Sequence, residues 1–389
     1  MRKTNWTTTI SSVATDTKGR AASPAKIDHP VHRDTASSGR PVMKVTIQSK
    51  SGELSFECEV GENLLYAGLR NGLSLPYECA TGTCGTCRAR VMEGEPEIGW
   101  SEAPGLSYVK QEKREVLMCQ ATAQGDCTLR VPAKVADGGG RGVAPEYGTG
   151  TIARVEKLTH DVMVFAVDLD TPMRFDAGQF VVLETGAVPG GRAYSMINYE
   201  DGAAVLEFVV KQKPDGRFSD WLFDDDCTGE TVRIFGPLGR ATFHPEEGKN
   251  VLCIGGGSGI AGIMSILAKA AGEGYFSDRR GYVFFGVRTA EDTFFMDELS
   301  AHAAAAPDNL EVVVALSDED VSPALERKYS ALTFATGLVH TVAAERMAGR
   351  WDDLIAYVAG PPPMVDGALR MLIIEARLPG TDIRYDKFG

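Results

Sequence analysis

The chain has 389 residues, of which 43% are hydrophobic and 24% charged, and its formal net charge is −13. This composition is ordinary for a globular protein with room for two or three domains, each with its own core. The acidic balance argues against a nucleic-acid partner, and the chain contains no apolar run near the ~18 residues that a membrane span requires.

Residues 1–42 differ in composition from the remainder of the chain. They are rich in Ser, Thr and Ala, contain seven Lys or Arg and three Asp, and have few large apolar side chains. Such a segment cannot bury enough apolar surface to offset its loss of chain entropy, so we predict a disordered tail. It lacks the apolar stretch of a secretory signal, and its basic, Ser-rich composition leaves an organellar transit peptide as the alternative.

Residues 43–135 form the first predicted domain. Alternating apolar side chains predict two strands, at 42–47 and 54–60, which a turn at Ser51-Gly52 joins. Residues 63–70 predict a short helix that Asn71-Gly72 ends.

A cysteine motif follows this helix. The spacing is C-x4-C-x2-C with a distant fourth cysteine, formed by Cys79, Cys84, Cys87 and Cys119. This is the plant-type pattern for a 2Fe-2S cluster, in which each iron needs two thiolates. Gly82 and Gly85 lie between the ligands, where a positive φ costs little and backbone N–H groups can turn toward sulfur. A zinc site usually pairs two short C-x2-C hooks, and one such hook is present here.

The other cysteines are Cys58, Cys127, Cys227 and Cys253. Cys127 is the alternative fourth ligand, although a strand-like approach at residues 115–118 leads directly to Cys119. Free thiols in apolar segments favour a reducing, cytoplasmic setting over a secreted disulfide scaffold.

A Gly-rich linker at 136–147 leads to the second predicted domain, residues 148–247. Five strand-like segments at short spacing predict an antiparallel barrel: 151–155, 163–169, 179–183, 205–210 and 231–234. Within it lies Arg192-Ala193-Tyr194-Ser195, which combines a cation for phosphate or a flavin carbonyl, a ring that can stack, and a hydroxyl. Taken in isolation, an R-x-Y-S is more often an ordinary strand that carries an exposed Arg.

The third predicted domain is residues 248–389. A buried-type strand at 250–254 is followed by a Gly-rich loop, Gly255-Gly256-Gly257-Ser258-Gly259, and then by a helical run at 264–270. Glycines allow the backbone to approach a pyrophosphate, whose charge the helix N-terminus stabilises. Further strands at 282–287, 310–315 and 354–359 alternate with helical segments and predict a doubly wound parallel α/β sheet.

The order of these motifs resembles the reductase components of bacterial multicomponent oxygenases, which serve Rieske dioxygenases or di-iron monooxygenases. These proteins belong to the ferredoxin–NADP reductase superfamily and carry an N-terminal plant-type ferredoxin domain. The resemblance covers residues 43–389. It rests on the cysteines, on R-x-Y-S, on the Gly-rich loop and on Ala359-Gly360-Pro361-Pro362-Pro363-Met364. Further matching stretches are Pro76-Tyr77-Glu78-Cys79, Ala103-Pro104-Gly105-Leu106, Gly216-Arg217-Phe218-Ser219 and Gly236-Pro237-Leu238-Gly239.

The resemblance implies a β-grasp-like α+β ferredoxin domain, an antiparallel β-barrel that binds FAD, and a doubly wound α/β domain that binds NADH. Leu117-Met118-Cys119-Gln120 resembles the segment with the family's last ligand, so the resemblance implies Cys119 rather than Cys127.

The resemblance also implies residue roles. The FAD isoalloxazine and its adjoining phosphate would lie against Arg192, Tyr194 and Ser195. The ribityl–pyrophosphate side would be lined by Val209, Val210 and Lys211, and the pyrophosphate would be bound by Gly216, Phe218 and Ser219. The nicotinamide nucleotide would face Gly255, Gly256, Gly257, Ser258 and Gly259, with its nicotinamide end against Gly360, Pro361 and Pro362. The residues expected nearest the reacting flavin are Tyr194, Ser195 and Phe388.

Two positions depart from the family pattern. Ala359 stands where the family often has Cys beside the hydride path, and Gly262 stands where it often has Pro. Some oxygenase reductases carry Ala at the first position, so we interpret Ala359 as tolerated.

Charge predicts the nucleotide. NADPH requires cations for its 2′-phosphate, whereas this chain places Ser317-Asp318-Glu319-Asp320 after the strand at 310–315. Carboxylates repel a phosphate and can accept a hydrogen bond from the 2′-hydroxyl of NADH, so we predict NADH with Asp318 at the ribose. Arg288 argues for NADPH instead, because it places a cation after the neighbouring strand.

We therefore predict a monomeric electron-transfer oxidoreductase in which NADH reduces FAD and the 2Fe-2S cluster passes single electrons onward. The expected acceptor is an oxygenase or its ferredoxin, in the hydroxylation of aromatic or other hydrocarbons. Two alternatives remain: a reductase for another acceptor such as a deoxysugar dehydrase, and a flavin redox sensor without turnover, which Ala359 alone would support.

Overall fold

The computed structural model describes residues 41–138 and 142–387. The predicted tail at 1–42 therefore lies almost wholly outside the described residues, as do part of the predicted linker and Phe388. In the described part of the chain, no helix combines the length and the apolar composition that crossing a lipid bilayer requires.

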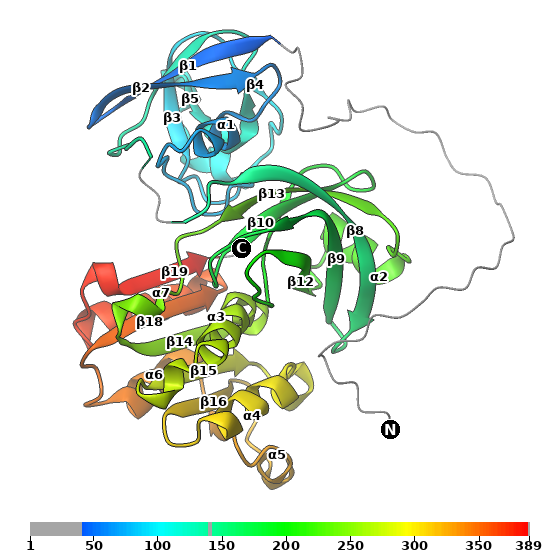
Figure 1. Ribbon diagram of the computed structural model, residues 1–389, viewed down its shortest axis with the longest axis vertical. Helices are drawn as coiled ribbons and strands as arrows, with labels where there is room; N and C mark the ends of the chain where they lie inside the picture. Colours follow the sequence, from blue (N-terminus) through cyan, green and yellow to red (C-terminus); the bar gives the residue numbers. More distant parts are fainter. Residues whose placement is uncertain (1–40, 139–141, 388–389) are drawn as a thin grey trace, which may run out of the picture. The chain divides into compact units, whose positions relative to one another are not determined.

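The first domain is a mixed five-stranded sheet in the order β2-β1-β7-β3-β5, coloured blue to cyan in Figure 1. Its strands are β1 (Val42–Ser49), β2 (Gly52–Glu59), β3 (Arg88–Glu93), β5 (Glu115–Leu117) and β7 (Cys127–Arg130). A small second sheet pairs β4 (Glu97–Ile98) with β6 (Ala121–Thr122).

The helix of this domain, α1 (Leu64–Arg70), begins where the sequence predicts. The Asn63 side chain accepts hydrogen bonds from the backbone N–H groups of Leu65 and Tyr66, which caps the first turn. Six of the seven residues of α1 are buried, and their apolar side chains belong to a cluster that includes the sheet of this domain and residues of the second domain. The α+β, β-grasp-like prediction is confirmed.

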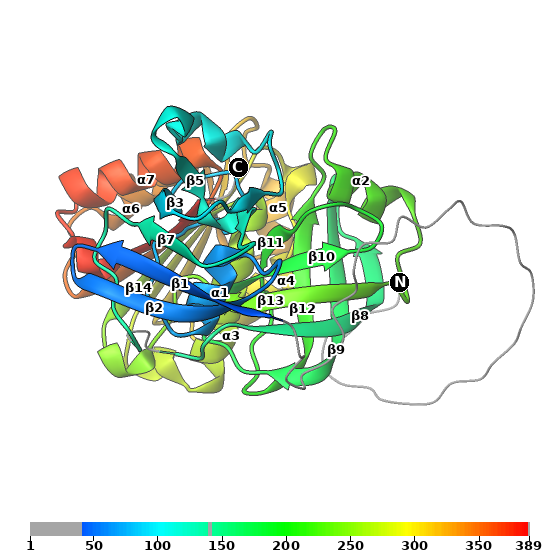
Figure 2. The same cartoon turned by 90° about the horizontal axis from the view of Figure 1, so that it is seen from above.

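The second domain is a six-stranded antiparallel sheet in the order β11-β10-β13-β8-β9-β12, whose green strands appear in Figure 2. Its strands are β8 (Glu146–Lys157), β9 (Val162–Met173), β10 (Phe180–Thr185), β11 (Arg192–Ser195), β12 (Ala203–Lys211) and β13 (Thr231–Leu238). An isolated bridge between Met196 and Phe208 joins the regions of the two edge strands, so the sheet curls into the predicted barrel. One helix, α2 (Arg217–Asp224), follows β12.

The third domain is a parallel six-stranded sheet in the order β17-β16-β15-β14-β18-β19. Its strands are β14 (Asn250–Gly256), β15 (Gly281–Val287), β16 (Leu310–Leu316), β17 (Thr333–Thr336), β18 (Leu354–Gly360) and β19 (Ile383–Lys387). The helices are α3 (Ile260–Gly272), α4 (Met296–Ala305), α5 (Pro323–Lys328), α6 (Val339–Met347) and α7 (Pro362–Ile374).

These helices cover both faces of the parallel sheet. One apolar cluster joins α3 and α4 to the sheet, and a second joins α6 and α7 to it. The doubly wound prediction is therefore confirmed. The order of strands reverses between β14 and β18, and ligands of such sheets bind beyond the carboxyl ends of the strands at this switch point.

Candidate functional site

The four predicted cluster ligands lie together in the first domain. Cys79, Cys87 and Cys119 are buried, whereas Cys84 is partly exposed. The sulfur atoms of Cys87 and Cys119 are 3.2 Å apart, although 32 residues separate them in the chain. The loop and the end of β5 therefore bring thiols from two segments into one group.

Backbone N–H groups surround the sulfur of Cys79. The amides of Thr81, Thr83 and Cys84 each donate to this Sγ at 3.4 Å, and the amide of Thr86 donates to the Sγ of Cys84 at 3.5 Å. Hydrogen bonds hold the pKa of the Cys79 thiol well below its usual range, and the largest contribution comes from the Cys84 side chain. Because metal ligands must be thiolates and N–H donors stabilise them, this donor set fits an iron–sulfur cluster.

Two glycines give the loop its shape. Gly82 has φ +91° and Gly85 has φ +76°, conformations that other residues rarely adopt. Gly105 supports the loop from outside: its N–H donates to the carbonyl of Gly82 at 2.9 Å, and a Cβ at this position would lie 2.8 Å from the same oxygen. The stretch Ala103-Pro104-Gly105-Leu106 thus buttresses the loop.

The structure separates the two candidate fourth ligands. Asn63, which caps α1, donates from Nδ2 to the carbonyl oxygen of Cys119 at 2.6 Å and so holds that residue beside the loop. Cys127 begins β7, pairs with Val45 and is buried in the sheet. This geometry favours Cys119, and the ligand set remains a proposal.

In the barrel, the R-x-Y-S motif forms β11. The ring of Tyr194 lies 5.2 Å from the ring of Phe218 on α2, centroid to centroid. Arg192 donates to the carbonyl of Gly191 at 2.9 Å, and Ser195 is 7% exposed. A guanidinium has five N–H donors, so Arg192 can donate to Gly191 and still donate to a phosphate. The donor set fits FAD.

The predicted pyrophosphate segment begins α2. Gly216 is the N-cap of α2, and the hydroxyl of Ser219 donates to the Gly216 carbonyl at 2.9 Å while accepting from the N–H of Lys213 at 3.1 Å. The Ser219 hydroxyl therefore fixes the turn that precedes α2, at the helix end where backbone N–H groups favour an anion. Val209 and Val210 are buried on β12.

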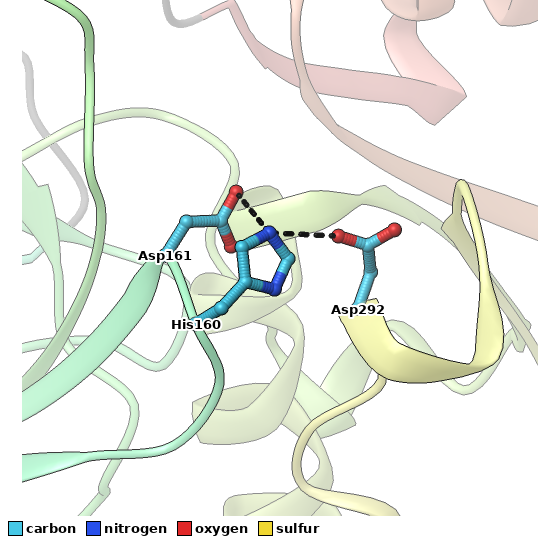
Figure 3. A group of neighbouring side chains, drawn as sticks. All are labelled: His160, Asp161 and Asp292. Carbon is cyan, nitrogen blue, oxygen red and sulfur yellow. Dashed lines mark ion pairs between the residues drawn. The ribbon is translucent and has the colours of Figure 1, made fainter.

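Lys211, predicted at the FAD ribityl side, forms an ion pair with Asp161. Figure 3 shows Asp161 beside His160 of the barrel and Asp292 of the third domain. The Lys211 ammonium lies 2.7 Å from Asp161, and His160 lies 3.6 Å from Asp161 and 3.9 Å from Asp292. Asp292 is buried and accepts two hydrogen bonds from Thr289 in a capping box. Although His160 and the two carboxylates are of metal-ligand type, Lys211 already supplies positive charge there, so we interpret the group as a contact between two domains.

The Gly-rich loop packs directly on the end of β18. A Cβ on Gly259 would lie 2.3 Å from the carbonyl oxygen of Ala359, and one on Gly256 would lie 3.3 Å from Pro361. Gly360 has φ +152° and lies against Gly256. The structure thus brings the two predicted halves of the nicotinamide nucleotide site together at the switch point, in a cradle that side chains would fill.

Asp318 lies at the carboxyl end of another strand of the same sheet. It follows β16, and its N–H donates to the carbonyl of Arg288 at 2.9 Å, so the predicted ribose carboxylate and the opposing cation are neighbours. Glu319 accepts a hydrogen bond from the N–H of Ala290 at 2.8 Å. Carboxylates therefore flank Arg288 at the ends of β15 and β16.

A narrow pocket of about 10 Å³ lies between the second and third domains. Its lining includes Ser195 of the barrel, Ala359 of β18 and Asp386 of β19. Burial, and then the charge of Glu78, raise the pKa of the Asp386 carboxyl to about 7. A residue that can hold a proton near neutral pH therefore lies beside the predicted flavin serine. Phe388 lies outside the described residues.

Sequence reasoning missed Asn63 and Gly105 as supports of the cysteine loop. The family resemblance placed residues 385–388 near the flavin, but it did not indicate that the Asp386 carboxyl binds a proton near neutral pH. The R-x-Y-S serine and Asp386 are far apart in the chain, so no local pattern links them. The buried tyrosine that touches the loop, Tyr66, reads in the sequence as an ordinary helix residue.

Three protein families match the chain in series. The 2Fe-2S iron–sulfur cluster binding domain matches residues 45–124, the oxidoreductase FAD-binding domain matches residues 149–243, and the oxidoreductase NAD-binding domain matches residues 253–370.

Relatives of known name match over most of their length. A ferredoxin–NAD(P)+ reductase of Metapseudomonas resinovorans is 34% identical over 339 residues, which is 87% of this chain and 98% of the relative. The ferredoxin–NAD+ reductase component of an alkene monooxygenase system from Xanthobacter autotrophicus is 34% identical, over 86% of this chain and 98% of the relative. Among solved structures, a ferredoxin reductase in carbazole 1,9a-dioxygenase is similar with a TM-score of 0.75 and 32% identity, over 90% of this chain and 100% of that one. An Amycolatopsis cytochrome P450 reductase is similar with a TM-score of 0.72 and 30% identity, over 88% and 98%.

Proposed function

The chain belongs to the family of ferredoxin–NAD(P)+ reductase components of oxygenase systems, and we propose that it passes electrons from NADH to an oxygenase or to the oxygenase's ferredoxin. It is an oxidoreductase with a 2Fe-2S, an FAD-binding and an NAD-binding domain. Our proposal adds the identity of the electron acceptor and the preference for NADH over NADPH.

The observation that carries the proposal is the pocket shared by Ser195, Ala359 and Asp386. The site would hold FAD, which would supply hydride acceptance from the nicotinamide, and the cysteine loop would hold a cluster that supplies one-electron transfer. The residues of this chain provide the meeting point: Ser195 offers a hydroxyl from the barrel, and Ala359 presents a small side chain at the end of β18. Asp386 holds or releases a proton at its carboxyl.

We assign the other site residues by position. Arg192 and the start of α2 bind the phosphates of FAD, with the ring of Tyr194 against the isoalloxazine. Gly255 to Gly259 and Gly360 to Pro362 bind the nicotinamide nucleotide. The ligands of the cluster are Cys79, Cys84, Cys87 and Cys119, and because Cys84 is partly exposed, we place the exit of electrons at its side of the loop.

The names of similar proteins support an oxygenase acceptor, since they include a dioxygenase, a monooxygenase and a cytochrome P450 system. We propose a Rieske or di-iron oxygenase system that hydroxylates an aromatic or other hydrocarbon. A deoxysugar dehydrase is the competing acceptor, and a redox sensor without turnover is the competing role.

We also propose a monomer in a reducing, cytoplasmic setting. The eight cysteines are all free thiols in the structure, which is typical of reducing compartments. Light scattering of the purified protein tests the first point, and fractionation of the native cells tests the second.

Anaerobic stopped-flow reduction tests the electron path. Full-length protein loaded with FAD and cluster is mixed with NADH. Flavin reduction is measured as loss of flavin absorbance, and cluster reduction is measured as the appearance of its EPR signal. Reduction of both groups, followed by oxidation on addition of a Rieske ferredoxin or a di-iron hydroxylase, supports the proposal. A flavin that stays oxidised supports the sensor, and reduction of a cytochrome P450 or a dehydrase in preference to either oxygenase overturns the proposed partner.

A further inference from the structure

We propose that Tyr66 is a positioning residue that fixes the cysteine loop to the FAD barrel, so that electrons pass from flavin to cluster without movement of the ferredoxin domain. This inference rests on the proposed electron path and concerns how the distance between its two groups is set. The transfer moves one electron from FAD to the cluster and changes no covalent bond.

The hydroxyl of Tyr66 contacts the cysteine loop. It donates to the carbonyl oxygen of Ala80 at 2.9 Å, and this contact is buried. Ala80 directly follows Cys79 and has φ +58°, a conformation that costs free energy in any residue other than glycine. The hydrogen bond therefore holds the backbone beside a proposed ligand in a conformation that the chain would not adopt alone.

The ring of Tyr66 contacts the barrel. It is stacked on the ring of Phe235 of β13, with centroids 4.2 Å apart and an angle of 15° between the planes. Tyr147 of β8 lies beside both rings, 6.4 Å from Tyr66 and 4.8 Å from Phe235. Tyr66 is 6% exposed and Phe235 is 3% exposed. One side chain thus joins the loop of one domain to a strand of the next.

A second contact holds the other side of Cys79. The hydroxyl of Tyr77, two residues before Cys79, accepts a hydrogen bond from the N–H of Gly239 at 3.0 Å. Arg240 donates to the carbonyl of Leu75 at 3.1 Å and lies over the Tyr77 ring, 5.7 Å from its centroid. The barrel therefore contacts the segment before Cys79 directly, and the segment after it through Tyr66.

The boundary between these domains has the character of a protein core. A single buried apolar cluster contains ferredoxin residues such as Tyr66 and Leu117 together with Phe180, Phe235 and Leu238 of the barrel. Domain surfaces that separate during turnover are usually more polar than this, because separation exposes them to water. A fixed arrangement is the consequence, since undocking would expose aromatic rings.

Two variants separate the roles of the ring and of the hydroxyl. Tyr66→Phe keeps the stacked ring and removes the donor to Ala80, so we expect faster amide hydrogen exchange in the cysteine loop and an altered EPR signal of the reduced cluster. Phe235→Leu keeps that hydrogen bond and removes the stack, so we expect flavin-to-cluster transfer to slow by at least about threefold. The matched control is Tyr275→Phe, which removes a buried tyrosine hydroxyl that donates to the Lys249 carbonyl at 2.5 Å in the NAD-binding domain; we expect neither change.

The decisive measurement compares the wild type with Phe235→Leu. Full-length protein loaded with FAD and cluster is reduced by a flash-generated donor, and the flavin-to-cluster rate is followed in buffers of increasing glycerol content. We expect a rate independent of viscosity in the wild type and dependent on it in Phe235→Leu. A wild-type rate that falls in proportion to viscosity overturns the fixed arrangement, and so does a Phe235→Leu rate equal to that of the wild type. An unaltered EPR signal and unaltered loop exchange in Tyr66→Phe overturn the role of Tyr66. Absence of a cluster signal in the wild type would instead refute the proposed function.

Discussion

Ala359 and Asp386 are in-register partners on the parallel strands β18 and β19. Both line the pocket that also contains Ser195. A small residue and an acid are thus paired at the point where the nicotinamide is proposed to meet the flavin. The last strand of the chain closes the site, and it does so with a titratable side chain.

The first prediction concerns pH. Because burial and the charge of Glu78 raise the pKa of Asp386 to about 7, the carboxyl is neutral below that pH and ionised above it. An ionised carboxylate disfavours negative charge arriving with the hydride, so flavin reduction by NADH should slow as pH rises through about 7. Asp386→Asn cannot ionise, and its stopped-flow profile should lack this inflection.

Stability should change in the same variant. A carboxyl with a raised pKa binds its proton more tightly in the folded state than in the unfolded state. The free energy of unfolding is therefore higher at low pH, and this contribution is lost as pH rises from about 4 to 7. The melting temperature of Asp386→Asn should therefore fall less over this window. The control is Asp366→Asn, which removes an exposed partner of Lys387. An inflection near pH 7 that persists in Asp386→Asn would exclude this residue as its origin.

The second prediction concerns the fourth cluster ligand. Cys119→Ala should remove the EPR signal and the bound iron, because its sulfur lies 3.2 Å from that of Cys87. Cys127→Ala should keep both, because Cys127 begins β7 and pairs with Val45 of the sheet, outside the cysteine loop. Iron analysis and EPR of the two purified variants measure this. Loss of the cluster in Cys127→Ala with retention in Cys119→Ala would reverse the assignment.

The sequence indicated those parts of the site that are local in the chain. The cysteine spacing and the Gly82 and Gly85 positions describe one loop, and the strand, Gly-rich loop and helix at 250–270 describe one supersecondary unit. Both motifs depend on backbone conformation over a few residues, and the spacing of Cys and Gly in the sequence indicates that conformation. The fold class followed from strand and helix periodicity together with the family resemblance.

The remainder depends on contacts between distant segments. Asp386 acquires its raised pKa from burial and from Glu78, a residue of another domain. Tyr66 reads as an apolar residue of a short helix, and its contact with Phe235 arises from domain packing. Strand β17 has four residues and β19 has five, and such short strands produce too little alternation to detect.

The third prediction concerns nucleotide choice. Asp318 is adjacent to Arg288 through a hydrogen bond between the Asp318 N–H and the Arg288 carbonyl. Asp318→Ser removes a carboxylate that would repel a 2′-phosphate and leaves the cation, so kcat/KM for NADPH relative to NADH should rise about tenfold. Asp308→Ser, an exposed acid before β16, should leave the ratio unchanged. A wild type that already prefers NADPH would refute the charge argument.

The fourth prediction concerns the close contact between the Gly-rich loop and β18. A Cβ at Gly259 would lie 2.3 Å from the carbonyl oxygen and 2.5 Å from the carbonyl carbon of Ala359. Both are backbone atoms and cannot rotate away, so Gly259→Ala should shift the start of α3 and destabilise the protein by about 1–3 kcal/mol. The affinity for NAD+ should fall, while FAD and cluster content stay at wild-type levels, because the displaced atoms belong to the NAD-binding domain.

Gly272→Ala is the matched control for this variant. Gly272 ends the same helix, α3, and a Cβ there meets nothing within 4 Å. Alanine lowers the entropy of the unfolded chain, so this change should be neutral or stabilising by up to about 1 kcal/mol. Thermal melts and calorimetric titration with NAD+ compare the two variants. Equal NAD+ affinity in both would mean that the contact with Ala359 does not shape the nucleotide site.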